Sequence, residues 1–529
     1  MRLVDCSDMS SSRVPEYIAL SHCWGGDVVG KLTTKNYAAL RRRIFENPDS
    51  LPQTFIDAIK VTREMGLRHL WIDSLCILQD SPSDWAGESP TMGQVFSSAH
   101  CVIAATASEN SRGGCFRDRP RFYTDISLLH SHGESICHIS TPNPSTRTFF
   151  STRVETAPLT KRAWAFQERL LSRRVVHFCS DVILFECNTV QASEFHPKGI
   201  GYETEQYEIH DGKLVAWLKD RVSSLTGRTV RAGDSTRAKR GIRGALDVLK
   251  SLGPSSGHRF AESIEFCKRW FDIVAAYTEG ALTRQTDKLI ALSGVAELVQ
   301  RQGRAPYLAG LWETDVLALQ LLWIVREPLD EQPLYCAPSW SWASVNGRIA
   351  LLPLTGLATA GLDNEAILSR ARIETARVFY QGQPVSEARS LVDSGYLVVT
   401  GPAAEGSSFD DAKTIRVFPP PAGHFLSAKP RIGRGKLLQF LPDNHSPQPP
   451  GNRILALHIM TVHHSDNIQK QYGLVLRLKR AASAPNGVPA VYERVGLWWT
   501  MTSLAPRGSK ASGSSEMFST WSPGSFTVE

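Results

Sequence analysis

The first 190 residues alternate between short apolar runs and segments whose apolar residues recur every three or four positions. The runs at 17–24, 67–73 and 101–107 have the length and apolar character of buried strands. The clearest helical face between them spans residues 55–65. Repeated alternation of this kind predicts an α/β fold, in which an open, mainly parallel sheet carries helices on its faces.

This α/β region is expected to occupy residues 1–195. Near its end, a helical pattern at 162–171 precedes the apolar runs VVHF and VILFEC, which predict a hairpin at the sheet edge. Different patterns follow along the chain, and they predict four further segments. These are an insertion or linker at 196–259, a helical segment at 260–350, a β-rich region at 351–503 and a disordered tail at 504–529.

Each of these segments is assigned from its own pattern. Residues 226–258 are basic and rich in Gly and Ser, without apolar periodicity, which is typical of a solvated linker. Residues 270–277 present one apolar helical face. Beyond 352, short runs such as RILALHIM alternate with loops rich in Pro and Gly. The SWSW run at 339–342 alternates as a strand does, which predicts two core tryptophans on one face.

Composition narrows the classes of protein that remain possible. The 59 basic and 52 acidic residues are spread along the chain, so the net charge of +7 does not predict a nucleic-acid partner. The N-terminus lacks the layout of a signal peptide, and the apolar stretch at 316–325 is about half of what a membrane span needs, so no membrane span is expected. Ten cysteines, most of them inside apolar runs, predict buried thiols in a reducing cytoplasm.

Polar residues follow two of the predicted strands at the point where each strand ends. The first group directly follows the run that starts at Tyr17, and the second follows the LWID run. Ligands of open parallel sheets bind outside the carboxyl ends of the strands, so the two loops could share a substrate pocket. Alternatively, these residues cap helices, and the histidine is a hydrogen-bonded core residue. The candidates are Ser21, His22 and Trp24 in the first loop and Asp73, Ser74 and Cys76 in the second.

Four ordered segments of the chain resemble the HET (heterokaryon incompatibility) domain of filamentous fungi. They are YIALSHCWGG, LPQTFIDAIKVTREMGLRHLWIDSLCILQD, DWAGESPTMGQVFSSAHCVIAATAS and TKRAWAFQERLLSRRVVHF. Farther along, DKLIALSGVAELV, YLAGLW and APSWSWASVNG resemble the region that commonly follows this domain, so the similarity covers roughly residues 1–350. His69 departs from the pattern, because the family commonly has tyrosine there.

The resemblance implies a role in nonself recognition and vegetative incompatibility, with programmed cell death after fusion between unlike strains. It also implies a TIR-like, three-layer fold. Enzymatic TIR domains cleave NAD with a glutamate placed three residues after a tryptophan, and Trp85 and Glu88 have that spacing. No permanently bound cofactor and no metal are expected, and NAD is a candidate substrate. The expected partners are other incompatibility or signalling proteins, including a second copy of the chain.

Glu88 is therefore the candidate catalytic carboxylate, together with Asp73. On one continuous helix, Glu88 would share a face with Trp85 and Phe96 and point toward the sheet. Partial burial there would raise its pKa, as acid/base catalysis near an oxocarbenium-like centre requires. The alternative is a carboxylate at a helix N-terminus, stabilised by the helix dipole. Pro90 bears on this choice, because its ring would clash with the carbonyl of Ala86 in an unbroken helix.

A further polar and aromatic cluster occurs in RAWAFQERLL. Trp164, Gln167 and Glu168 belong to it, and the four-residue spacing of Trp164 and Glu168 places both on one helix face. We interpret this cluster as structural, with Arg162 and Arg169 as potential partners of carboxylates or phosphate.

Two functional hypotheses from different classes follow. In the first, the protein is a cell-death effector that consumes NAD or a related nucleotide. In the second, it is a non-enzymatic signalling or interaction module in which these residues serve packing. A third hypothesis, hydrolysis by Cys76 with His22, depends on a contact that no sequence feature fixes.

Overall fold

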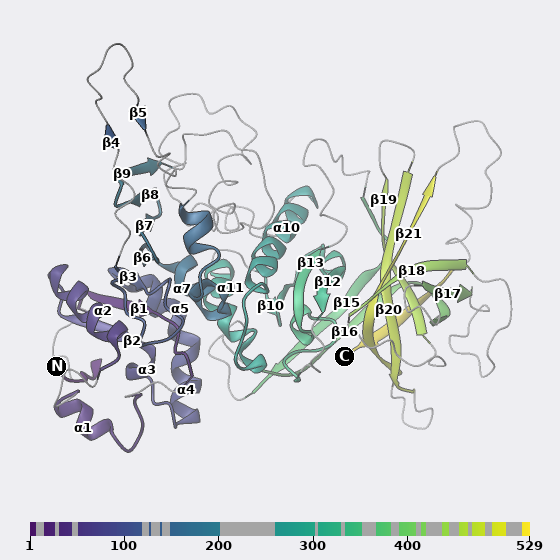
Figure 1. Ribbon diagram of the computed structural model, residues 1–529. Coiled ribbons are helices and arrows are strands. Elements are labelled where there is room, and N and C mark those ends of the chain that lie inside the picture. Colours follow the sequence, from purple (N-terminus) through teal and green to yellow (C-terminus); the bar gives the residue numbers. More distant parts are fainter. Residues whose placement is uncertain are drawn as a thin grey trace, which may run out of the picture. The chain divides into compact units, whose positions relative to one another are not determined.

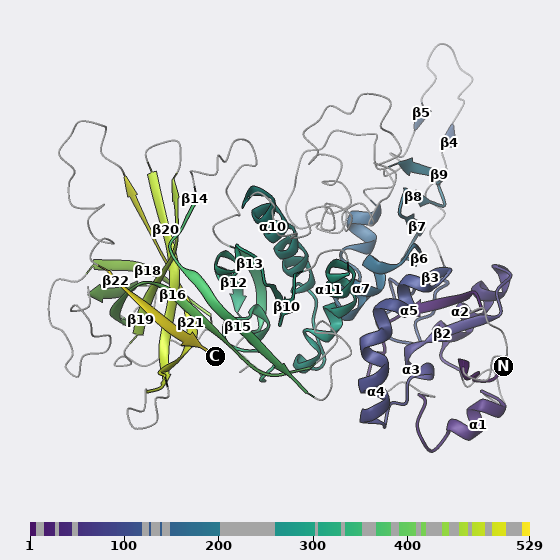
Figure 2. The same ribbon diagram turned by 180° about the vertical axis from the view of Figure 1, so that it is seen from behind.

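The computed structural model divides into two compact units, residues 1–248 and 249–529, and each is considered by itself. Figure 1 and Figure 2 show the chain from opposite sides. The structure describes residues 1–6, 15–26, 31–44, 51–118, 126–127, 138–139, 149–201, 260–301, 305–328, 334–351, 367–381, 391–408, 414–418, 436–443, 454–463, 468–481, 489–503 and 521–529.

The first unit is built on a seven-stranded sheet with the order β2-β1-β3-β6-β7-β8-β9. The pairs β1–β2, β1–β3 and β3–β6 are parallel, and the remaining neighbours are antiparallel. A parallel core is thus extended by an antiparallel meander. The strands are β1 (Tyr17–Ser21), β2 (His69–Ile72), β3 (Cys101–Ala104), β6 (Arg174–Phe178), β7 (Ile183–Cys187), β8 (Val190–Ser193) and β9 (His196–Gly201).

Helices cover both faces of the parallel strands. Alternate residues of β1 enter two different cores: Ile18 and Leu20 pack with Phe55 of α2, whereas Ala19 packs with Phe96 of α5. Burial on both faces explains why the strands read as continuous apolar runs rather than alternating ones. The helices are α1 (Tyr37–Arg42), α2 (Gln53–Glu64), α3 (Asp73–Cys76), α4 (Pro82–Glu88), α5 (Met92–Ser98) and α7 (Ala163–Leu171).

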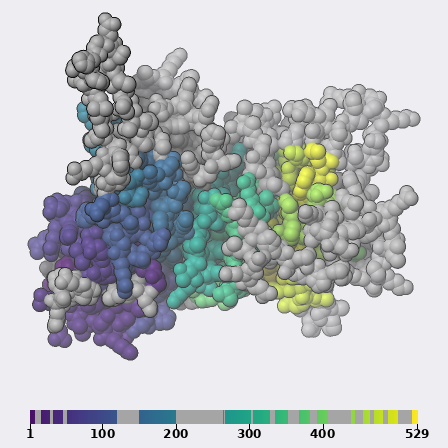
Figure 3. All heavy atoms as spheres, viewed as in Figure 1, coloured from purple at the N-terminus to yellow at the C-terminus, as the bar shows by residue number. Residues whose placement is uncertain are grey.

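The α/β fold predicted for this region is therefore confirmed, and β6 and β7 form the expected hairpin. The hairpin does not lie at the sheet edge as predicted, because β8 and β9 extend the sheet beyond β7. Its described residues appear in Figure 3, coloured purple to blue, as one contiguous body. The sheet continues past residue 195, because β9 pairs with β8. Residues 202–259, which hold most of the expected linker, lie outside the described residues. A two-residue pair, β4 (Ile126–Ser127) and β5 (His138–Ile139), is antiparallel.

The second unit begins with the helical segment. The predicted face at 270–277 is buried on α10, including Trp270 and Tyr277. The segment also contains two small antiparallel hairpins, so it is less purely helical than expected. Its elements are α10 (Phe260–Tyr277), α11 (Ser293–Gln300), α12 (Leu317–Gln320), β10 (Tyr307–Leu308), β11 (Leu311–Trp312), β12 (Trp323–Pro328) and β13 (Gly347–Leu351).

The predicted β-rich region forms a nine-stranded, mainly antiparallel sheet. Its longest strand, β16, pairs with β15, β17, β19 and β22. The strands are β14 (Ile367–Ser369), β15 (Arg372–Tyr380), β16 (Val392–Ser408), β17 (Thr414–Phe418), β18 (Lys436–Pro442), β19 (Ile454–His463), β20 (Ile468–Arg480), β21 (Val491–Ser503) and β22 (Ser522–Val528).

Two predictions in the second unit are wrong. Residues 522–528 form β22 instead of belonging to a disordered tail, because their backbone pairs with β16 and Phe526 and Val528 are buried. Residues 504–520 lie outside the described residues. The SWSW run is a turn followed by a 3-10 helix rather than a strand, although Trp340 and Trp342 are buried as expected.

Among the described residues, no helix is long and apolar enough to cross a membrane.

Candidate active site at the carboxyl edge of the parallel sheet

The centre of the first unit's sheet contains a change of chain direction. From β1 the chain moves outward to β2 and then crosses to β3, on the other side of β1. The carboxyl ends of β1 and β3 therefore form a topological switch point, and open α/β sheets bind ligands outside such points. The predicted residues Ser21 and His22 stand at the end of β1, and Asp73 directly follows β2.

Side-chain alternation sends Ser21 and His22 to opposite faces of the sheet. Ser21 continues the row of Ala19, and its hydroxyl donates a hydrogen bond to Oε2 of Glu168, on α7. His22 continues the row of Ile18 and Leu20, and its ring meets Phe55 edge to face, with centroids 5.2 Å apart. The end of β1 therefore connects the helices of both layers.

The end of β2 lies beside the loop that follows β1. Trp24 Nε1 donates to Asp73 Oδ2 at 2.8 Å, and His22 Nδ1 lies 3.8 Å from Asp73 Oδ1. The second distance is too long for a hydrogen bond. Asp73 Oδ1 also accepts from the backbone N–H of Ser74 at 2.7 Å, whereas the buried Ser74 hydroxyl makes no hydrogen bond to the described residues. Four of the six residues predicted in the two loops, His22, Trp24, Asp73 and Ser74, thus meet at one edge.

Gly25 allows the loop after β1 to lie against the loop after β3. Its φ of +72° is in the left-handed region, and a Cβ at this position would lie 1.9 Å from Cβ of Asn110. The hydroxyl of Ser111 donates to the carbonyls of Cys23 and Trp24, at 3.4 and 3.3 Å. The absence of a side chain at Gly25 therefore lets the two loops that flank the switch point approach, and the hydroxyl of Ser111 connects them.

Glu168 is the most strongly perturbed carboxyl group of this edge. It is buried, and burial is the main reason that its pKa rises to about 7, with a smaller contribution from the charge of Asp73. The guanidinium of Arg162 and the hydrogen bond from Ser21 act in the opposite direction. Arg162 also donates to the backbone carbonyl of His22. A carboxyl group with a pKa near 7 can both give and accept a proton at physiological pH.

His22 is buried without a hydrogen-bond partner among the described residues, at either ring nitrogen. Burial lowers its pKa to about 4; the charge of Asp73 opposes this shift, and the charge of Arg162 adds to it. The ring is therefore neutral at pH 7, with one nitrogen able to donate and the other able to accept. A buried imidazole that leaves both functions unused is available to a bound molecule.

Glu88 is placed differently from the expectation. Ser81 caps α4, accepting from the N–H of Asp84 at 3.2 Å, and the helix ends at Glu88. A 3-10 turn at 89–91 contains Pro90 and separates α4 from α5, so the ring of the proline does interrupt the helix. Glu88 is exposed and lies at a helix C-terminus rather than an N-terminus. Partial burial and the charge of Asp84 nonetheless raise its pKa.

The remaining predicted residues are Trp85, Trp164, Gln167 and Cys76. Trp85 is half-buried on α4, and Trp164 packs against the core on the α5 and α7 side of the sheet. Gln167 is fully buried. Burial raises the pKa of the Cys76 thiol to about 12, so this group is protonated at pH 7 and is not a nucleophile. The charges of Asp73 and Glu88 make smaller contributions to the same rise in pKa.

A second buried network begins one residue after Glu168. Arg169 pairs with Glu186 at 2.5 Å and with Glu155 at 3.1 Å, and Glu186 also lies 3.1 Å from Nε2 of His177. The sequence signalled Arg169 as a partner of carboxylates, and the structure confirms that. Its two glutamates had no recognisable signal, because they lie 14 and 17 residues away along the chain.

The chemistry available at the edge is proton transfer. It offers a carboxyl group that titrates near neutrality, an ionisable Asp73, a neutral imidazole and an arginine within one buried neighbourhood. Among the described residues, no group of three or more His, Cys, Asp or Glu side chains could hold a metal ion.

Comparison with known proteins identifies the same region. Neither a curated protein nor a solved structure matches the chain. Residues 17–168 match the family model described as Heterokaryon incompatibility protein (HET). The match begins at the first residue of β1 and ends at Glu168, so it encloses both the strands and the polar groups of the carboxyl edge. Residues 17–168 of this chain are therefore a HET domain.

Proposed function

We propose that this protein acts in fungal nonself recognition and vegetative incompatibility, and that its HET domain triggers programmed cell death in the cytoplasm by cleaving NAD or a related nucleotide. The observation that carries the enzymatic part is the meeting of Ser21, His22, Asp73 and Glu168 at the switch point of the sheet. The biological setting is supported by the HET family match.

The proposed reaction is hydrolysis of the bond between nicotinamide and the ribose C1′. As this C–N bond breaks, its electron pair leaves with nicotinamide, and positive charge develops on the ribose. Water then forms a bond to C1′ and loses a proton to an ionised carboxylate, which gives ADP-ribose and nicotinamide. A carboxylate beside the developing oxocarbenium charge stabilises it, and His22 offers hydrogen bonds to the polar groups of the nucleotide.

Two carboxyl groups are candidates for the base. Glu168 has the appropriate pKa and the central position, but it is buried and bonded to Ser21, so a substrate must displace that hydrogen bond. Glu88 has the tryptophan spacing that the TIR resemblance implies, and it is exposed near Cys76. We retain both, with Asp73 as the residue that orients Trp24 and supports the local charge.

A non-enzymatic signalling module is the second candidate, and one observation favours it. Ser21 and Glu168 already satisfy each other, and only 3% of Glu168 is accessible to solvent. In this case the carboxyl edge is a structural core, and killing depends on surfaces that recruit signalling proteins or a second copy of the chain.

The deciding experiment measures NAD and viability together. The full chain is expressed from an inducible promoter in yeast as wild type, Glu168→Gln, Glu88→Gln and Asp73→Asn. Glu64→Gln, on the exposed end of α2, is the matched control. We expect wild type and the control to deplete NAD and kill the cells, and Asp73→Asn together with at least one of the other two variants to do neither. Nicotinamide release by the purified chain tests the same ranking directly.

The outcomes separate the hypotheses. Killing with unchanged NAD contradicts the enzymatic proposal and favours the signalling module. NAD loss that survives Glu168→Gln but not Glu88→Gln assigns the base to Glu88, and the reverse assigns it to Glu168. If Glu168 is the base, nicotinamide release rises with pH through about 7, as the carboxyl group ionises.

A further inference from the structure

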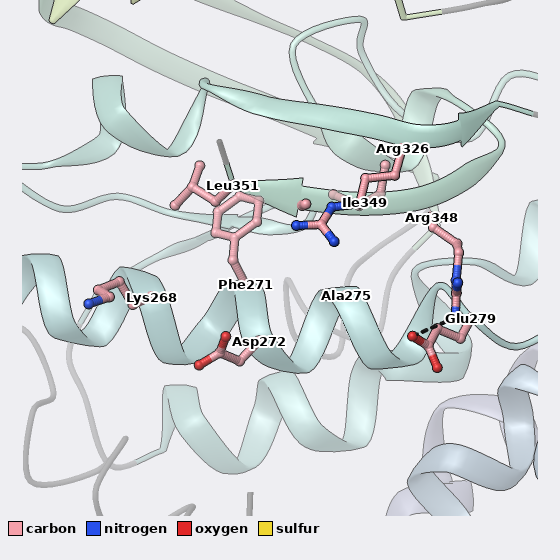
Figure 4. Close-up of a pocket in the computed structure, with 10 residues that line it drawn as sticks. Lys268, Phe271, Asp272, Ala275, Glu279, Arg326, Arg348, Ile349 and Leu351 are labelled. Atoms are coloured by element: carbon pink, nitrogen blue, oxygen red, sulfur yellow. Dashed lines mark ion pairs between the residues drawn. The ribbon is translucent and has the colours of Figure 1, made fainter. Parts of the chain in front are cut away.

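A cleft in the second unit lies between α10 and the β12–β13 hairpin and has a volume of about 230 Å³. Figure 4 shows the side chains that line it. The cleft combines an apolar floor with a charged rim. The floor is formed by Phe271, Ala275, Ile349, Ala350 and Leu351, and the rim by Lys268, Asp272, Glu279, Arg326 and Arg348.

α10 supplies Lys268, Phe271, Asp272 and Ala275 to this lining, and Glu279 stands in the turn that follows the helix. Lys268, Asp272 and Ala275 follow one another at four- and three-residue spacing, so they form a single row along the helix. Phe271 stands beside this row and is 3% exposed, which makes it a firm part of the floor. α10 packs against β13, so the row lies beside the hairpin and is partly exposed.

The hairpin supplies the opposite wall, and an irregularity in its pairing affects one residue. The register of β12 and β13 is regular from Trp323 to Val325, then shifts before Pro328. Arg326 lies within this shift. A β-bulge changes the direction of the side chain that it contains, and such irregularities are common next to binding sites. Figure 4 shows the guanidinium of Arg326 extending over the cleft, between Phe271 and the pair Arg348–Glu279.

The rim of the cleft has more positive than negative side chains. Arg348 Nη2 pairs with Glu279 Oε1 at 2.7 Å, and Asp272 Oδ2 accepts from Arg269 at 3.5 Å. Both carboxylates of the rim thus have a cation beside them. Arg326 is exposed, and it makes no ion pair with any residue that the structure describes. A net positive charge therefore remains on the side of the cleft that holds Arg326, above an apolar floor.

We propose that this cleft binds a small organic anion, namely a carboxylate or phosphate monoester carried on a compact apolar ring. The guanidinium of Arg326 pairs with the anionic group, because its planar donors match two oxygens of a carboxylate or phosphate. The apolar ring packs against Phe271 and Leu351. This contact distinguishes the ligand from a simple anion, which the charged rim alone would also bind. The site belongs to the second unit and does not depend on the chemistry proposed for the HET domain.

The test uses the full chain and three probes in isothermal titration calorimetry. Phenyl phosphate carries both features, inorganic phosphate carries only the anion, and phenol carries only the ring. We expect phenyl phosphate to bind at least about tenfold more tightly than phenol, which cannot form the charge-assisted pair with Arg326, and than inorganic phosphate, which leaves the apolar floor unfilled. We expect Arg326→Gln to weaken phenyl phosphate binding by about the same factor.

Arg372→Gln is the matched control, because Arg372 is an arginine of the same unit whose side chain is 82% exposed and does not line the cleft. This variant should bind phenyl phosphate as tightly as wild type. The proposal is overturned if wild type does not bind phenyl phosphate, if the two arginine variants weaken its binding equally, or if inorganic phosphate binds as tightly as phenyl phosphate. Circular dichroism of each variant confirms that loss of binding does not reflect loss of fold.

Discussion

Buried polar groups are treated differently in the core of the second unit and at the carboxyl edge of the first unit's sheet. In the second unit, Arg494 is held by both oxygens of Asp443 at 2.9 and 3.0 Å and by two backbone carbonyls, and Lys288 is held by three oxygens. In the HET domain, His22 is as deeply buried but uses neither nitrogen, and Glu168 has a pKa near 7. Saturated groups contribute to stability, whereas unsaturated ones mark a place where binding can occur.

The groups with and without full hydrogen bonding also differ in where they lie in the fold. Arg494 crosses from β21 to the end of β12, where its guanidinium lies 3.3 Å from the ring centre of Trp323. The guanidinium also contacts the carbonyl of Leu321 and both oxygens of Asp443. His22 instead directly follows β1, and Glu168, on α7, reaches the end of β1 through its hydrogen bond with Ser21. Charge inside a saturated core connects elements, and charge at a sheet edge is near a ligand-binding crevice.

The largest expected effect is on the saturated pair. Asp443→Asn leaves the guanidinium of Arg494 buried without its counter-charge, and we expect it to lower the free energy of unfolding by about 3–5 kcal/mol. The measurement is urea unfolding of the full chain, with hydrogen exchange in β21 to identify the unit that unfolds. The double variant Asp443→Leu/Arg494→Met removes both charges and should recover most of the loss. A loss below about 1 kcal/mol in the single variant would show that the pair does not stabilise the core.

A smaller effect is expected from His22, and it depends on pH. Its folded-state pKa of about 4 lies below the ordinary value of 6.5, so unfolded chains take up a proton that folded chains refuse. Wild type should therefore lose up to about 3 kcal/mol of stability from this group as pH falls from 6.5 to 4. His22→Phe keeps the ring against Phe55 and should lose that dependence. Identical pH profiles for wild type and variant, measured by urea unfolding, would contradict the assignment.

Glu168 should give the smallest effect, with the opposite sign. Its folded-state pKa of about 7 lies above the ordinary 4.5, so its contribution to stability is fully present below 4.5 and is lost as pH rises through 7. Glu168→Gln removes the buried charge, and we expect a gain of about 1–2 kcal/mol at pH 8, after the cost of an amide nitrogen placed near Arg162. Thermal unfolding at pH 5 and pH 8 provides the check. A variant destabilised at pH 8 would mean that the ionised form serves the fold.

The sequence predicted most of the first unit because its pattern is local. Burial on both faces of the sheet produces continuous apolar runs, and Pro52 and Gly66 mark the limits of α2. β22 was missed because its residues are mostly small or polar, and the pairing with β16 and β21 makes them a strand. The SWSW run was misassigned because alternation shows that two tryptophans are buried, but not which backbone carries them.

The candidate site was predicted in part for the same reason. Ser21, His22 and Asp73 follow apolar strands directly, so their position at the sheet edge could be read from the order of residues. The partner of Ser21 could not, because Glu168 is 147 residues away along the chain. Nothing in RAWAFQERLL distinguishes a carboxylate that packs against arginine from one that reaches β1.

The sequence by itself determined the α/β fold of the first unit, its resemblance to the HET domain and the two polar loops at the strand ends, since each depends on residues close together in the chain. The tertiary structure alone decided which carboxyl group occupies the centre of the edge. It placed Glu168 beside Ser21 and Arg162, and it left Glu88 exposed where Pro90 interrupts the helix. A pKa depends on burial and on charges brought together by folding, and neither quantity is contained in the spacing of residues.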